Sequence, residues 1–179
     1  ARPASIGTEI SRGYDVSYLG YSGDGHLGRF NLSTSAYYAF GEEKPGVFVR
    51  EKTDIRAGFF AAELSMDFDW IRPRASVLYA SGDDDPFDRT AKGFDSIFEN
   101  PQFAGSDASY WIRQSVPLLG GGRVGLSSRN GVLNSLRSSK EQGQSNFTNP
   151  GMVLVGMGVD MDILPELRVS ANWNSLHFA

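Results

Sequence analysis

The sequence of 179 residues contains no cysteine, which excludes a disulfide framework, thiolate catalysis and a cysteine-ligated metal. It has no run of roughly 18 apolar residues, the length that a membrane-spanning helix requires, and its mean hydropathy is -0.29. No positively charged start followed by an apolar signal-peptide core is found. We therefore expect a chain that is either soluble or crosses a membrane as strands.

Basic residues are also few, with 17 Lys and Arg against 21 Asp and Glu, a net charge of -4 and a pI near 5.2. Nucleic acid is not an expected partner, because binding it generally requires a clustered basic face. What the sequence has in quantity is 21 Gly, 12 Phe, 7 Tyr and 3 Trp, beside many small polar residues. This mixture is typical of strands that have one hydrated polar face and one apolar face.

Apolar and polar residues alternate in six segments, as expected of strands whose neighbouring side chains point to opposite faces. The six segments are residues 13–21, 29–41, 55–69, 74–82, 153–162 and 167–174. In the first, Tyr14, Val16 and Tyr18 form the apolar face and Leu19 is out of place on the other. Pro and Gly predict short turns at 69–73, 163–166 and 22–28, and longer loops at 42–53 and 83–150.

The length of the alternating segments favours a membrane β-barrel over a soluble sheet. In the third and fifth segments, alternation continues over roughly ten or more residues, enough for a tilted strand to cross a bilayer, whereas soluble strands are usually shorter. Bacterial barrels typically have an even number of strands, from about 8 upwards, so six would not close one. The predicted fold is all-β, a transmembrane antiparallel up-and-down β-barrel segment over residues 1–179, with one long external or lumen-folded loop at 83–150.

Polar residues on the strand faces opposite the apolar positions are predicted to line an aqueous lumen, where charged groups remain hydrated. These lumen-facing residues are Glu63, Asp67, Arg74, Asp160, Asp162, Arg168, Asn172 and Asn174. In the long loop, Arg113, Arg123 and Arg137 could form a constriction that selects anionic solutes, as charged rings do in other pores. The alternative for this basic part of the loop is a solvated surface or a lipopolysaccharide contact.

Metal binding and catalysis have little support. Asp83, Asp84, Asp85 and Asp88 offer the hard oxygen ligands that Ca²⁺ prefers, but their spacing does not match the calcium-loop signature. The sequence has only two histidines, His26 and His177, and no G-x-S-x-G elbow accompanies them. We therefore expect no enzymatic activity and no cofactor.

The run YASGDDDP at residues 79–86, where a strand passes into an external loop, resembles the strand exit of the alginate-export family of outer-membrane porins. Residues 93–105, 136–140 and 146–151 look like a subgroup of large outer-membrane proteins, and the resemblance covers roughly residues 75–178. It implies a porin-type barrel. Alginate exporters have a strongly basic lumen, from which the acidic inward faces of this chain depart.

The predicted function is passage of solutes or polysaccharide through a porin- or exporter-type channel in the outer membrane of Gram-negative bacteria. Its expected partners are outer-membrane lipid and lipopolysaccharide, with a possible protein partner at the long loop. A structural barrel that anchors or encloses a protein partner is the alternative. A soluble carbohydrate-binding β-sandwich and an outer-membrane hydrolase rank below it.

Overall fold

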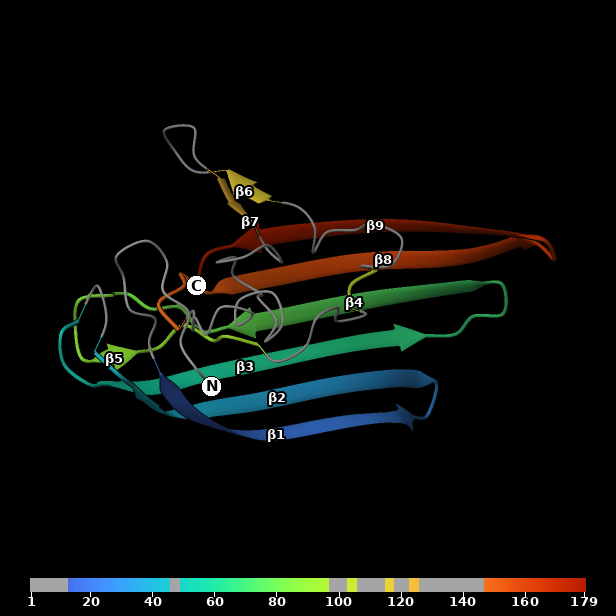
Figure 1. Cartoon of the computed structure of the whole chain (residues 1–179). Coiled ribbons are helices and arrows are strands. Elements are labelled where there is room, and N and C mark those ends of the chain that lie inside the picture. Colours follow the sequence, from blue (N-terminus) through green and yellow to red (C-terminus); the bar gives the residue numbers. More distant parts are fainter. Residues whose placement is uncertain (1–12, 46–48, 97–102, 106–114, 118–122, 126–146) are drawn as a thin grey trace.

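The computed structural model of the chain is an all-β protein built on one large sheet (Figure 1). It describes residues 13–45, 49–96, 103–105, 115–117, 123–125 and 147–179. The strands are β1 (Tyr14–Leu27), β2 (Phe30–Glu43), β3 (Thr53–Met66), β4 (Ile71–Ala80), β5 (Thr90–Ala91), β6 (Ser115–Pro117), β7 (Arg123–Gly125), β8 (Met152–Leu164) and β9 (Leu167–His177). In these parts of the chain, no helix is long and apolar enough to cross a membrane.

The six long strands follow one another in the order β1-β2-β3-β4-β8-β9, and every neighbouring pair among them is antiparallel. The two-residue strand β5 pairs with β3 in parallel, and β6 and β7 form a separate small hairpin. Strands β1 and β9 are the two edges, so the sheet as described is open. The six strands predicted from alternation are therefore confirmed, and closure into a barrel is not tested.

One end of the sheet has tight turns and the other has long connections. The turn between β1 and β2 contains only Gly28 and Arg29, and Gly28 has φ 67°. Glycine at the first position of a two-residue hairpin turn tolerates this left-handed backbone. The other two turns at this end lie between β3 and β4 and between β8 and β9. We call this end the turn end, and the opposite end the loop end.

One expectation about turns was wrong and another is confirmed in part. Residues 22–28 were predicted as a turn, but β1 continues to Leu27 in full register with β2. Residues 69–73 were predicted as a turn in which Pro ends pairing. A short turn does join β3 to β4 at residues 67–70, and the β3–β4 pairing stops before Pro73, but Pro73 itself lies inside β4 opposite Val159 of β8. The β3–β4 ladder reaches only to the pair Ser65 and Arg74, so Pro73 lies beyond the ladder on that side, where its missing N–H costs little.

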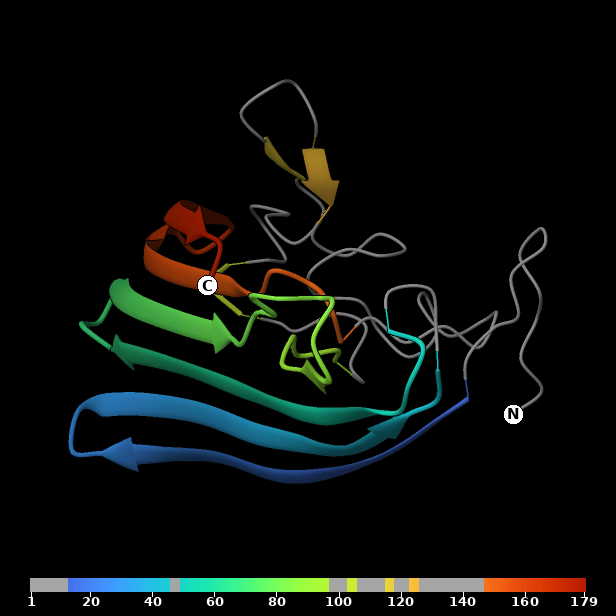
Figure 2. The same ribbon diagram turned by 90° about the vertical axis from the view of Figure 1, so that its left-hand side faces the viewer.

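The sheet curves like a trough, and segments of the chain between β4 and β8 lie on its concave side (Figure 2). The helical turn considered for residues 93–100 is not present in the described part, 93–96, and the one considered for 130–138 lies outside the described residues.

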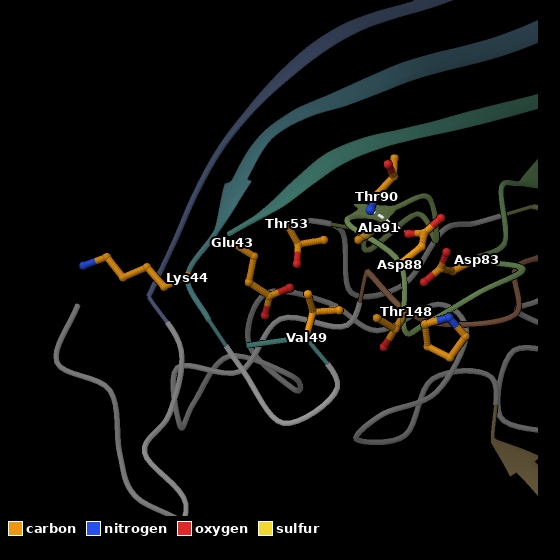
Figure 3. A pocket seen from close by; sticks show the side chains of 10 residues that line it. Glu43, Lys44, Val49, Thr53, Asp83, Asp88, Thr90, Ala91 and Thr148 are labelled. Carbon is orange, nitrogen blue, oxygen red and sulfur yellow. Dashed lines mark hydrogen bonds between the residues drawn. The ribbon is translucent and has the colours of Figure 1, made fainter. Parts of the chain in front are cut away.

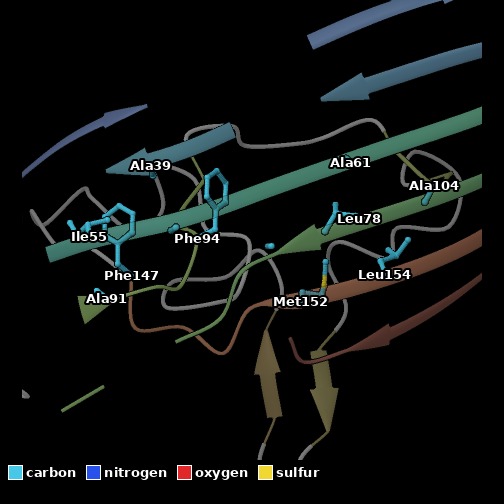
Figure 4. Close-up of a cluster of buried hydrophobic side chains, with 12 residues drawn as sticks. Ala39, Ile55, Ala61, Leu78, Ala91, Phe94, Ala104, Phe147, Met152 and Leu154 are labelled. Atoms are coloured by element: carbon cyan, nitrogen blue, oxygen red, sulfur yellow. The ribbon is translucent and has the colours of Figure 1, made fainter. Parts of the chain in front are cut away.

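The buried core lies between the concave face and these segments (Figure 4). From the six long strands it includes Ile55, Leu78, Met152 and Leu154, from β5 Ala91, and from the covering segments Phe94, Ala104 and Phe147.

Candidate functional site on the concave face of the sheet

The convex face of the sheet is apolar and exposed. Paired residues in antiparallel strands share a face, so the register assigns each side chain to one side. We call the positions whose side chains lie on the convex face the outward positions. Away from the loop end, the outward positions of all six long strands carry no Asp, Glu, Lys or Arg. The exposed outward side chains include Leu19, Tyr21, Tyr38, Phe40, Phe60, Leu64, Val77, Tyr79, Val155, Met157, Val169 and Trp173. A contiguous apolar surface of this kind marks an interaction site for protein or membrane.

Aromatic rings lie near both ends of this convex face. Tyr38 and Phe40 stack on each other with ring centroids 6.0 Å apart near the loop end. Phe68 and Trp70, exposed by 42% and 55%, lie in the turn between β3 and β4. The only charged residues at outward positions of the long strands are Asp15, Glu42, Asp54 and Arg56, all at the loop end. The convex face is therefore an apolar band with aromatic rings near both ends and outward charges at the loop end only.

The predicted orientation of the first strand was reversed. Tyr14, Val16 and Tyr18 were assigned to the apolar outer face, but the register places them on the concave side, with Leu19 facing outward. The reason is packing against the long loop that follows β4, because the Tyr18 hydroxyl donates to the Asp95 carbonyl at 2.9 Å and its ring meets Phe94 edge-on at 6.3 Å. For the other five strands, the apolar positions predicted from alternation do lie on the convex face.

At the loop end, the concave face is apolar and covered. Phe94 stacks on Phe59 of β3 with centroids 5.2 Å apart, and its backbone N–H donates to the Ser81 carbonyl at 2.8 Å. Asn149 donates from its side chain to the Phe94 carbonyl at 3.1 Å. The Gly93 N–H donates to the Phe147 carbonyl at 2.8 Å. The two segments from the long loop therefore support each other while they cover the sheet.

A polar contact then fixes the turn at residues 103–105 against the middle of the concave face. The Ala104 N–H donates to Glu63 Oε2 at 2.9 Å, and the same oxygen accepts from the Ser76 hydroxyl at 2.6 Å. The Asn174 amide donates to the Ala104 carbonyl at 3.1 Å. We call Glu63, Ser76, Ala104 and Asn174 the Ala104 latch. Because Glu63 lies on β3 and Asn174 on β9, this latch connects the loop to strands on both sides of β4 and β8.

The Ala104 latch gives a first prediction. Replacing Glu63 by leucine removes the acceptor for a buried N–H and a buried hydroxyl, each of which costs about 1 to 3 kcal/mol when left unsatisfied. We expect faster hydrogen exchange at the Ala104 amide, by at least tenfold, as the turn opens locally. Glu63→Gln keeps an acceptor oxygen and should exchange nearly as slowly as the wild type. Equal exchange in the wild type and Glu63→Leu would contradict the latch.

Arg74 forms the most protected ion pair on the concave face. Its Nη1 donates to Asp160 Oδ2 at 2.9 Å and its Nη2 to Asn172 Oδ1 at 2.5 Å, while Ser170 donates to Asp160 Oδ1 at 2.6 Å. The Arg74 and Asp160 side chains are 14% and 21% exposed. Gly158 makes room for this cluster, because a Cβ there would lie 2.5 Å from Arg74 Nε. The ion pair is thus held from three strands.

Beyond Arg74 towards the turn end, the concave face is polar and open. Arg72 pairs with Asp67, and Arg168 donates to Asp162 at 2.6 Å and 2.9 Å. Hydrogen bonds from Asn31 and Arg72 lower the pKa of Asp67, which lies in the turn after β3. A hollow on this part of the face is lined by Asp24, Gly25, His26, Asn31, Leu32, Ser33, Ser65, Asp67 and Arg72.

All eight residues predicted to face a lumen lie on the concave side of the sheet. Three of them, Arg74, Asp160 and Asn172, are brought together on β4, β8 and β9, and Asn174 and Glu63 meet the Ala104 turn. Arg123 is the first residue of β7, and Arg113 and Arg137 lie outside the described residues, so the arginine constriction stays a prediction. Sequence analysis missed the hollow beside Asp24 and the contact of Glu63 with Ala104, which has no signal in local spacing.

Three of the four aspartates proposed for calcium, Asp84, Asp85 and Asp88, bind other groups of the loop after β4, whereas both side-chain oxygens of Asp83 are buried without a hydrogen-bond partner in the part of the chain that the structure describes. Asp84 pairs with Lys92 at 2.7 Å, which lowers the pKa of Asp84. Asp85 and Asp88 accept from the backbone N–H of Phe87 and Thr90 at 3.0 Å and 2.6 Å. Asp83 and Asp88 line a small pocket with Glu43 and Thr53 (Figure 3). Within the described residues, no group of three or more acidic or histidine side chains is placed to hold a metal ion.

Asp83 provides a pH-dependent prediction. Burial, together with the neighbouring carboxylates of Asp88 and Asp84, raises the pKa of Asp83 above its usual 3.8. A carboxyl whose pKa is raised by folding favours the folded state when it is protonated, and this stability is lost as the pH rises through the folded pKa. Asp83→Asn is therefore expected to raise the unfolding temperature at pH 7, with a difference that shrinks towards pH 4 and below. An equal difference at both pH values would contradict it.

Comparison of the chain with family models, with curated proteins and with solved structures found no match. The resemblance to alginate-export porins therefore stays a prediction.

Proposed function

We propose that this chain forms part of the wall of a β-barrel channel in the outer membrane of Gram-negative bacteria, with its convex face in lipid and its concave face towards an aqueous passage. It would allow hydrophilic solutes to pass without chemistry or a cofactor. The loop segments on the concave face would narrow that passage from the loop end. Lipid and lipopolysaccharide would be its main partners.

The observation that carries this proposal is the distribution of charge between the two faces. A soluble sheet places its apolar face against a core and its charges towards water. Here the uncovered convex face is free of charge over its central band, and ion pairs such as Arg74–Asp160 lie on the concave side. Lipid is a solvent in which such a convex surface is stable, and hydrated charges facing a lumen are expected in the same structure.

The strand geometry agrees with this proposal. Strands β1, β2 and β3 each have 14 residues and β8 has 13, while a tilted strand needs about 9 to 11 to span a bilayer. Tight turns at one end and long connections at the other are also typical of outer-membrane barrels.

The polar half of the concave face favours a channel over a barrel that has a packed interior and only anchors a protein partner. A barrel that only anchors a partner would fill its interior with packed side chains. The apolar packing around Phe94 and Phe147 is confined to the loop end, while the hollow beside Asp24 and Arg72 is open. The soluble sandwich has less support, because a second sheet large enough to cover the convex face is absent from the described residues.

The test is to express the native protein that contains these six strands with export to the envelope, fractionate the membranes, and compare boiled and unboiled samples by gel electrophoresis. We expect recovery with the outer membrane, extraction only by detergent, and a shift in mobility on boiling. Extracted protein should then give discrete conductance steps in planar bilayers. Recovery as a soluble protein without detergent would overturn the membrane assignment, and a membrane protein without conductance would favour the anchor.

A further inference from the structure

The charged side chains of the concave face are not balanced. Its acidic members are Asp24, Glu63, Asp67, Asp160 and Asp162, and its basic members are Arg72, Arg74 and Arg168. Glu43 also lies on this side but is buried at the loop end. The uncovered part of the face therefore carries more carboxylates than guanidinium groups.

Each of the three arginines is neutralised by an aspartate. Arg74 pairs with Asp160, Arg72 with Asp67, and Arg168 with Asp162. Further hydrogen bonds from Asn31 to Asp67 and from Ser170 to Asp160 hold these aspartates in place. A passing anion would have to compete with these local carboxylates for every guanidinium group on this face.

Two carboxylates have no such basic partner. Glu63 accepts from the Ser76 hydroxyl and the Ala104 N–H, both of them neutral donors. Asp24 is exposed on β1, takes part in none of the ion pairs of the described residues, and lines the hollow with Asn31, Ser33 and Ser65. Amides, hydroxyls and an unpaired carboxylate are groups that interact with small cations and with hydroxyl-bearing neutral solutes.

We infer that the passage bounded by this face conducts small cations and neutral hydrophilic solutes in preference to anions, with Asp24 as a selectivity-determining residue. The inference rests on the proposed channel function and names the class of its solutes. Charged groups lining a pore set ion selectivity by raising the local concentration of the opposite ion. An acidic polysaccharide would find repulsion from Asp24 and no unpaired guanidinium group on the face.

The experiment measures the reversal potential of the purified native protein that contains these strands, in planar bilayers under a KCl gradient. We expect a potential of the sign that indicates K⁺ preference, reduced several-fold in permeability ratio by Asp24→Asn. The matched control is Asp15→Asn, the same change on the same strand but on the convex face, which should leave the ratio unchanged. Arg72→Gln frees the Asp67 carboxylate and should raise cation preference, so the two substitutions are expected to act in opposite directions.

The outcomes separate the two proposals. If no conductance is found, the channel function fails. If conductance is found with preference for Cl⁻, the channel stands and the selectivity inference is overturned. An unchanged ratio in Asp24→Asn, when the variant still shows the mobility shift on boiling, would also overturn the role of Asp24.

Discussion

Met157→Arg is expected to reduce the free energy of unfolding by about 2 to 4 kcal/mol in lipid vesicles, the cost of a basic side chain near the middle of a lipid-facing strand surface. Met157 lies midway along the convex positions of β8 and is 63% exposed. In water, replacing so exposed a side chain with one of similar length would change stability by no more than about 0.5 kcal/mol. The substitution therefore distinguishes lipid from water as the solvent of this face.

The control for Met157→Arg is Ser33→Arg, which places the same new charge on the concave side of β2. Ser33 is exposed and lines the hollow with Asp24 and Asp67, so a guanidinium group there would remain hydrated and near carboxylates. We expect little loss of stability. Measurement is by guanidinium unfolding of the refolded variants in phospholipid vesicles. Equal and small effects of the two substitutions would contradict a lipid-facing convex surface.

Arg74→Met is expected to cost about 2 to 3 kcal/mol of the free energy of unfolding, because it leaves Asp160 as a largely buried carboxylate without its cation. Breaking one side of a protected ion pair is costly mainly through the charge that remains. In the double variant with Asp160→Asn, that charge is absent and a large part of the loss should be recovered. The same unfolding experiment measures all of these variants.

A matched control for Arg74→Met is available two residues away. Arg72 lies on the same strand and the same face and also pairs with an aspartate, but its side chain and that of Asp67 are 54% and 50% exposed. Exposed ion pairs contribute little because both groups remain solvated when separated. We therefore expect Arg72→Met to have a much smaller effect. Equal losses in Arg72→Met and Arg74→Met would show that burial does not set the cost.

The six long strands could be predicted from the sequence because apolar and polar side chains alternate over many residues. Such alternation is expected when the two faces of a sheet have different surroundings. It failed in β1 for two physical reasons. The glycines at 23 and 25 occupy outward positions and hide the alternation, so the strand was ended too early. Val16 and Tyr18 pack against the core that the loop segments help to form, and a loop that returns from a distant part of the chain leaves no mark on local periodicity.

The candidate site was predictable to the same degree. The face of each of the eight predicted residues followed from its odd or even place along its strand, which is why all eight lie on one side. Their partners did not follow, because Arg74 and Asn172 are separated by 98 positions and meet only through the order of the strands. The Ala104 contact depends in addition on Ala104 adopting φ 51°, a left-handed backbone that alanine seldom takes and that composition does not indicate.

The two ends of the long loop, where it leaves β4 and where it enters β8, lie next to each other. The Asp83 N–H donates to the Asn149 carbonyl at 2.8 Å, and a Cβ on Gly151 would lie 2.4 Å from the Gly82 nitrogen. Strands β1 to β4 and strands β8 and β9 are therefore two runs of local hairpins, each able to form from contacts close in sequence. Their union requires closure of the longest loop in the chain, so that joining is expected to be the slow step of folding. The close backbone contact between Gly82 and Gly151, next to the β4–β8 pairing, would then be among the last contacts to form.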